Sequence, residues 1–162
     1  MKENNLKNTY FLAYGAAIAA IYVALTMAFQ PISFGPVQFR ISEALCILPF
    51  FTPAAIPGLA VGCAVANLAT GCALWDVAFG TLATTLGALG TYYIGRKYPY
   101  AGPAFPIAAN ALIVPKVLQV VYGAEGTYWY FMLTVGIGEI LSCGVLGIIL
   151  YRVLRKTKIF EE

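Results

Sequence analysis

The sequence has 162 residues, of which 60% are hydrophobic and only 10% are charged. A soluble domain carries about 25% charged residues because its surface must face water, so this composition excludes a soluble globule and indicates a protein that crosses the lipid bilayer several times. The net charge of +3 comes from the chain ends and gives no reason to expect nucleic-acid binding, and the absence of His removes the commonest proton shuttle and metal ligand.

The first predicted element is an apolar run from Tyr10 to Phe29, preceded by two lysines. It is too long for the apolar core of a signal peptide, and no clear small-x-small cleavage site follows. We therefore expect a first membrane span that stays attached. At about 20 residues per crossing, spans are predicted near residues 9–29, 38–52, 54–71, 77–95, 104–122 and 128–153.

The second and third spans are less clear than the others because three prolines lie in or between them: Pro49, Pro53 and Pro57. Proline favours helix ends and turns, so we expect a tight turn at Thr52-Pro53. One span followed by a re-entrant segment is the alternative.

The basic residues favour six spans, because Lys and Arg are enriched in cytoplasmic loops. With both termini cytoplasmic, one side holds Lys2, Lys7, Arg96, Lys97, Arg152, Arg155, Lys156 and Lys158. The opposite loops, near residues 30–37, 72–76 and 123–127, contain no Lys or Arg. Merging the second and third spans would divide the basic residues between the two sides. The sequence thus predicts an all-α integral membrane protein, a single six-helix domain over residues 1–162. Aromatic residues predict belts at the outer and inner membrane surfaces: Tyr122, Tyr128, Trp129 and Tyr130, and Tyr92, Tyr93, Tyr98 and Tyr100.

Small residues recur four apart in two predicted helices. The first span contains Ala13-x-x-x-Ala17 and Ala16-x-x-x-Ala20-x-x-x-Ala24, and the third contains Gly58-x-x-x-Gly62. Such stripes let another helix approach closely. For the two glycines we expect packing inside the bundle. For the alanines, both internal packing and an external helical partner remain open.

Several polar side chains fall within or beside the apolar segments, although each charge there costs about 2.5–3.5 kcal/mol on insertion scales. They are Arg40, Glu43, Asn67, Asp76, Asn110, Lys116, Gln119 and Glu139. In the predicted topology most lie in the outer half of the bundle. Together with Phe39 and Trp75 they indicate a solute pocket, with aromatic faces for a flat ring and charges for its polar edge.

Simpler interpretations of these residues remain open. Arg40 could pair with Glu43, Lys116 could pair with Glu139, and Asp76 could be a helix N-cap. The four cysteines read as small hydrophobic residues, so we expect no metal site and no cofactor. Nucleophile-elbow, zinc-protease and Walker A motifs are absent from the sequence, which argues against an enzyme.

Four parts of the sequence resemble the queuosine-precursor transporter family, QueT: the run from Phe39 to Leu45, the helix from Pro53 to Asn67, Trp75-Asp76, and Gly138-Glu139. The resemblance implies a substrate-binding S component of an energy-coupling factor (ECF) transporter in a prokaryotic cytoplasmic membrane. Such a subunit would bind a 7-deazaguanine such as preQ0, preQ1 or queuine. It would dock on a module of two ATPases and a transmembrane coupling protein. The stripe Ala13, Ala16, Ala17 and Ala20 matches the docking motif of S components.

The chemistry of a deazaguanine fits the polar residues. Glu139 or Glu43 could accept hydrogen bonds from N1 and the exocyclic amine as a bidentate pair. Lys116, Asn67 or Gln119 could donate to O6, and Trp75 or Phe39 could stack on the ring. Asp76 could hold an aminomethyl group. The alternatives are an S component for another vitamin-like heterocycle, a stand-alone carrier, and a small membrane enzyme.

Overall fold

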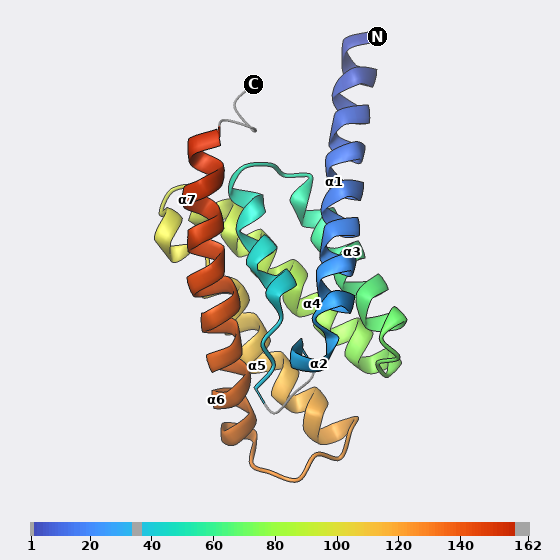
Figure 1. The fold of residues 1–162 in the computed structure, drawn as a ribbon, viewed down its shortest axis with the longest axis vertical. Coiled ribbons are helices and arrows are strands. Elements are labelled where there is room, and N and C mark those ends of the chain that lie inside the picture. The colour runs from blue at the N-terminus through green and yellow to red at the C-terminus, as the bar shows by residue number, and fades with distance from the viewer. Residues whose placement is uncertain (1, 34–36, 158–162) are drawn as a thin grey trace.

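The computed structural model describes residues 2–33 and 37–157, and every regular element in these ranges is helical. The chain begins with α1 (Lys2–Ala28) and the short α2 (Gln30–Ser33), followed by the 3₁₀ helix η1 (Ile41–Phe50) and by α3 (Ala55–Ala69). Next come α4 (Leu74–Gly90), which continues as the π-helical η2 (Thr91–Gly95), and the 3₁₀ turn η3 (Pro99–Ala101). The last elements are α5 (Ala104–Val120), α6 (Tyr128–Glu139), the π-helical η4 (Ile140–Leu146) and α7 (Gly147–Thr157). Figure 1 shows them as an elongated bundle in which α6, η4 and α7 form one long helix.

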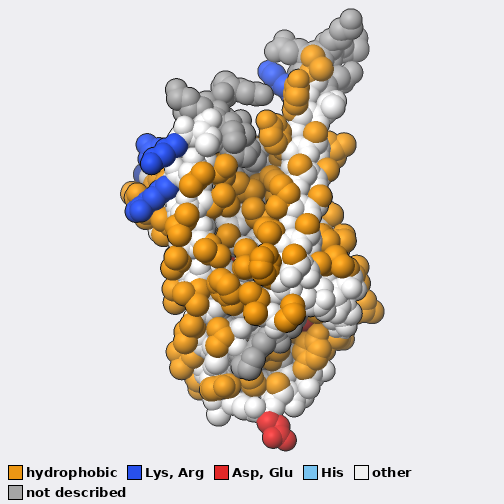
Figure 2. All heavy atoms as spheres, viewed as in Figure 1, with side chains coloured by type: hydrophobic (Ala, Val, Ile, Leu, Met, Phe, Trp, Pro, Cys, Tyr) orange, Lys and Arg blue, Asp and Glu red, His pale blue; other side chains and the backbone are white. Residues whose placement is uncertain are grey.

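The outer surface of this bundle is apolar, as a lipid-facing surface must be. Hydrophobic side chains cover the face seen in Figure 2, and large apolar residues such as Leu12, Leu74 and Leu133 are more than half exposed. Four helical stretches are long and apolar enough to cross a membrane: Leu6–Ala28, Leu74–Gly95, Pro99–Val120 and Tyr128–Thr157. The chain is therefore an α-helical, multi-pass membrane protein, as predicted.

The predicted second and third spans correspond to the shorter helices η1 and α3. The expected turn between them is confirmed: η1 ends at Phe50, α3 begins at Ala55, and the Ala54 N–H donates to Thr52 Oγ1 at 3.3 Å. Because η1 and α3 are short, the six-span count remains a prediction.

Helices α1 and α3 pack closely through their glycines. A Cβ atom on Gly58 would lie 3.2 Å from the Gly15 Cα and from the Ile18 Cβ, and one on Gly62 would lie 2.9 Å from the Tyr22 Cβ. The internal packing expected for Gly58 and Gly62 is thus confirmed. The opposite face of α1 carries the alanine stripe, whose members are all exposed: Ala13, Ala16, Ala17, Ala20 and Ala24.

The two ends of the bundle differ in charge. Helix α1 begins and α7 ends at the same end of the bundle (Figure 1). In Figure 2 the Lys and Arg side chains gather at that end, and acidic side chains appear at the other. The two predicted aromatic groups lie at opposite ends of α5, since one precedes that helix and the other follows it.

Candidate functional site

The 3₁₀ geometry of η1 brings polar residues into one column. A 3₁₀ helix has three residues per turn, so side chains at i and i+3 eclipse one another. Arg40, which caps the helix, therefore lies in line with Glu43 and Cys46, and all three are buried. Helix α1 fixes this column, because the Tyr22 hydroxyl donates to Glu43 Oε1 and Thr26 Oγ1 donates to Ser42 Oγ at 2.7 Å.

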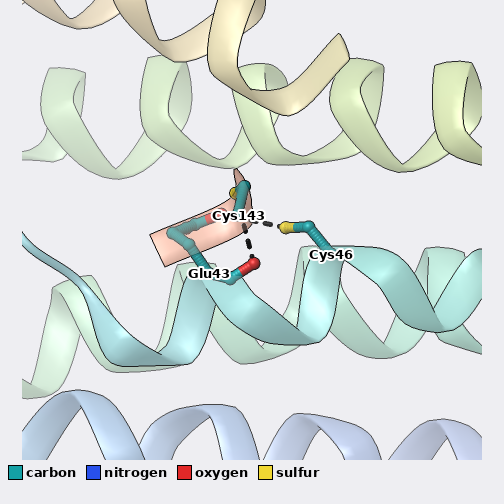
Figure 3. Close-up of side chains that lie close together, drawn as sticks. All are labelled: Glu43, Cys46 and Cys143. Atoms are coloured by element: carbon teal, nitrogen blue, oxygen red, sulfur yellow. Dashed lines mark hydrogen bonds between the residues drawn. The ribbon is translucent and has the colours of Figure 1, made fainter. Parts of the chain in front are cut away.

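The junction of α6 and η4 supplies the second group of polar residues. Glu139 is the last residue of α6, and Cys143 follows one turn later on the π-helical segment. The single S–H of Cys143 is shared between two acceptors, Glu139 Oε2 at 3.2 Å and the Glu43 carbonyl oxygen at 3.3 Å. The Cys46 thiol donates to Glu43 Oε2 at 2.9 Å. Figure 3 shows Glu43, Cys46 and Cys143 converging from the two helices. Two acids and two thiols therefore meet in the interior of a membrane protein.

Asn67 of α3 and Asp76 of α4 extend this cluster. A Cβ on Gly80 would lie 3.0 Å from Asn67 Nδ2 and 3.9 Å from Asp76 Oδ1, so both side chains border one narrow space that a larger residue would fill. Asn67 is fully buried, and its Oδ1 has no hydrogen-bond partner among the described residues. Arg40 lies close enough to Glu43 and Asp76 to interact with both electrostatically. Arg40 therefore links the two acidic groups.

The N-cap role considered for Asp76 is wrong. The N-cap of α4 is Ala73, and Asp76 lies in the first turn with its Oδ2 accepting from the Tyr122 hydroxyl at 2.9 Å. Burial, with a further contribution from Asp76, raises the pKa of Tyr122 to about 12. The hydroxyl thus stays protonated at neutral pH and remains a donor to the carboxylate.

Lys116 and Trp75 meet on a different surface. They line a groove of about 830 Å³ between α4 and α5, in which the Trp75 ring stacks on Phe79 with centroids 5.9 Å apart. Lys116 is exposed whereas Glu139 is buried, and no ion pair joins the two in the described part of the chain. The alternative pairing of Lys116 with Glu139 is therefore wrong.

The two remaining predicted residues lie at the margins. Gln119 donates through Nε2 to the Gly126 carbonyl at 2.9 Å and so tethers the α5–α6 loop. Phe39 is half-buried in the segment before η1. The structure thus gathers Arg40, Glu43, Asn67, Asp76 and Glu139 inside the bundle, and it places Lys116, Trp75 and Gln119 elsewhere.

The segment at residues 37–40 lies directly against Gly138, next to Glu139. A Cβ atom on Gly138 would overlap the Gln38 carbonyl group, so only glycine allows this approach. Glu43 and Glu139 are only 1% and 4% exposed. A ligand can therefore reach the two carboxyl groups only after some covering segment moves, and residues 37–40 are adjacent to both.

Sequence reasoning missed Tyr22, Cys46 and Cys143, which contact the acids. The expectation that the cysteines serve as small hydrophobic residues is incomplete, because two of the thiols hydrogen-bond to carboxylates. The spacing Glu43-x-x-Cys46 and Glu139-x-x-x-Cys143 was the available signal, since each pair shares one helix face.

Comparison with known proteins gives two matches that agree. The profile of the family described as "QueT transporter" matches residues 12–156. A protein of Lactococcus lactis subsp. cremoris (strain MG1363), described as "Queuosine precursor transporter QueT", is 30% identical over 146 residues, covering 83% of this chain and 86% of that protein. No solved structure gives a significant match.

Proposed function

The chain belongs to the QueT transporter family, and from that premise we propose that it is the substrate-binding S component of an energy-coupling factor transporter, taking up a 7-deazaguanine precursor of queuosine. The family and the bacterial relative are transporters, not enzymes. The relative is named for queuosine precursors, which supports this ligand class. We place the protein in a prokaryotic cytoplasmic membrane.

The observation that carries the ligand assignment is the pair of buried carboxyl groups, Glu43 and Glu139. A deazaguanine offers two adjacent donors, N1–H and the exocyclic amine, which a carboxylate can accept together in charge-assisted hydrogen bonds. Both oxygens of Glu43 already accept from protein donors, Tyr22 and Cys46. Glu139 accepts from the weak thiol donor of Cys143. We therefore assign recognition of the ring edge to Glu139.

Asn67 and Phe39 complete the proposed contacts. Asn67 presents an amide whose Nδ2 can donate to O6 and whose Oδ1 can accept from a ring N–H. To Phe39, half-buried on the segment whose backbone contacts Gly138, we assign the stacking contact with the ring. Asp76, linked electrostatically to Arg40, is available to a cationic substituent. Lys116, Trp75 and Gln119 are left out of this pocket because their side chains face other surfaces.

The proposal includes partners and a topology. Six spans with both termini cytoplasmic agree with the gathering of Lys and Arg at one end of the bundle (Figure 2). The exposed alanines of α1 offer a helix of the coupling protein a close approach. Beside them, a groove of about 270 Å³ between α1 and α3 is lined by residues such as Leu12, Pro57 and Val61. ATP hydrolysis is assigned to two ATPases on separate chains.

The test is direct binding by the purified chain, without partners. We expect saturable binding of at least one of preQ0, preQ1 and queuine, and none of adenine, which lacks both donors at the corresponding edge. Reconstituted alone in liposomes, the chain should bind without concentrating the ligand. Failure to bind any of the three would overturn the ligand assignment. Concentrative uptake by the chain alone would overturn the S-component assignment and indicate a stand-alone carrier.

A further inference from the structure

The acid–thiol cluster has the donor set of a metal site as well as that of a ligand pocket. One carboxylate oxygen of Glu43 and the sulfur atoms of Cys46 and Cys143 all lie within 4.8 Å of one another, and all three residues are buried (Figure 3). Glu139 lies outside this group of three but has a carboxylate oxygen 3.2 Å from the Cys143 sulfur, so it can supply a fourth donor when a cation draws the group together. Two sulfur and two oxygen donors suit a thiophilic cation of the zinc class.

Two sulfur–oxygen pairs of the cluster are already near the spacing that such a cation needs. In tetrahedral zinc sites, Zn–S bonds of about 2.3 Å and Zn–O bonds of about 2.0 Å put sulfur and oxygen about 3.5 Å apart. The hydrogen-bonded sulfur–oxygen pairs here are 2.9 Å apart (Cys46–Glu43) and 3.2 Å apart (Cys143–Glu139). To hold one cation, each of these two pairs must widen by about 0.3–0.6 Å. The two pairs must also draw together, since the Glu43, Cys46 and Cys143 donor atoms lie up to 4.8 Å from one another.

An outer hydrogen bond holds the Glu43 carboxylate in place, as such bonds do at metal sites. The Tyr22 hydroxyl donates to Glu43 Oε1, the oxygen that Cys46 does not contact. Arg40, close to Glu43, offsets part of the negative charge that two thiolates and two carboxylates bring. These groups are what distinguishes the cluster from four donors that merely lie close together.

We propose that Glu43, Cys46, Glu139 and Cys143 form a binding site for a thiophilic divalent cation such as Zn²⁺. On binding, the cation forms bonds to both sulfur atoms, and the two thiol protons leave to the solvent. No electron is transferred. Since Glu139 also reads the ligand in the proposed function, on which this consequence rests, a bound cation and a deazaguanine exclude one another. The cation would then switch substrate binding off.

The experiment titrates the purified, reduced full-length chain with Cd²⁺ in the absence of any deazaguanine. Bound cadmium gives an ultraviolet thiolate-to-metal charge-transfer band, which we expect to saturate at one equivalent. Cys46→Ser and Cys143→Ser should each weaken binding by more than about 100-fold, since each removes a direct ligand. Cys72→Ser is the matched control, because Cys72 lies in the loop before α4, outside the cluster, and this variant should bind like the unmodified protein.

X-ray absorption of the zinc-bound, unmodified protein tests the same site even if the cysteine variants do not fold. Two sulfur neighbours at about 2.3 Å, with oxygen completing the shell, are expected. A shell of oxygen and nitrogen alone, or a cadmium band that Cys72→Ser abolishes and Cys46→Ser does not, would overturn the proposal. Because no deazaguanine is present, either outcome is independent of whether the chain binds one.

Discussion

Glu139 lies near the middle of the long helix formed by α6, η4 and α7, and its carboxyl group is buried. Its closest hydrogen-bond donor is the Cys143 thiol, a weak one, and Lys116 lies on another surface. A carboxyl group in an apolar interior is costly unless it is well satisfied. Because a thiol is a weak donor, the Glu139 carboxyl keeps acceptor capacity for the ligand proposed above.

The change Glu139→Gln should weaken deazaguanine binding by about 2–4 kcal/mol, or about 30- to 1,000-fold. Glutamine keeps the size and one acceptor but replaces the other acceptor with a donor that faces the N–H groups of the ligand. Titration calorimetry with the purified chain measures this. Lys116→Met is the control and should leave affinity unchanged, because Lys116 is exposed in the α4–α5 groove. Affinity equal to the unmodified protein in Glu139→Gln would move ring recognition to Glu43.

Tyr22 is expected to contribute mainly to stability. Tyr22→Phe removes the hydroxyl that donates to the buried Glu43 Oε1. Leaving that oxygen without a donor should lower the free energy of unfolding by about 1–3 kcal/mol, seen as a lower melting temperature in detergent. Tyr93→Phe, at a residue that is 72% exposed, should have no measurable effect. Equal melting temperatures for the two variants would contradict the role given to Tyr22.

At the scale of elements, hydropathy predicted where the helices lie along the chain. It did not predict which of them take the 3₁₀ or π form. The predicted segments at residues 77–95, 104–122 and 128–153 correspond to α4 with η2, to α5, and to the helix of α6, η4 and α7. Neither the 3₁₀ form of η1 nor the π-helical turns in the long helices left a hydropathy signal, because both forms are set by tertiary packing. The 3₁₀ form of η1 places Glu43 over Cys46, and the π-helical η4 begins directly after Glu139. The geometry of the site therefore depends on helix forms that the sequence pattern could not predict.

Glycine at position 138 should control how residues 37–40 close over the site. In Gly138→Ala the new methyl group would overlap the Gln38 carbonyl, so the segment must shift away from Glu139. We expect a ligand dissociation rate raised by about tenfold, which corresponds to about 1.4 kcal/mol. Stopped-flow measurements give this rate. In Gly136→Ala the added Cβ would lie 3.8 Å from the Ala111 Cβ, an ordinary contact, and the rate should not change.

At the scale of the whole molecule, α1 has one face inside the bundle and one exposed face. Its inner face packs on α3 through Gly15 and Tyr22, and its outer face presents the alanine stripe. The sequence predicted internal packing for Gly58 and Gly62 but left the side of the alanine stripe open, because small residues favour close helix packing both inside a bundle and against a partner. The arrangement of α1 and α3 resolves this.

Ala16→Trp or Ala20→Trp should abolish assembly with the energising module, because an indole ring prevents the close approach of a partner helix. Ligand binding by the solitary chain should persist. Ile21→Trp is the matched control, since Ile21 is exposed on the same helix but already bulky. Co-purification with the coupling protein measures assembly. Loss of ligand binding with the complex intact would mean that the stripe supports the fold instead.

The shortness of η1 and α3 has a consequence for how the protein is made. At about 2.0 Å per residue, the ten residues of η1 span about 20 Å, and the fifteen of α3 span about 22 Å at 1.5 Å each, against about 30 Å of hydrocarbon. The charged side chains of Arg40 and Glu43 add to the free-energy cost of moving η1 from the translocon into lipid. We therefore do not expect η1 or α3 to insert into the bilayer by itself as it is synthesised. The two should instead insert as a hairpin between α1 and a newly made α4, which makes biogenesis a cooperative event rather than a series of independent helix insertions.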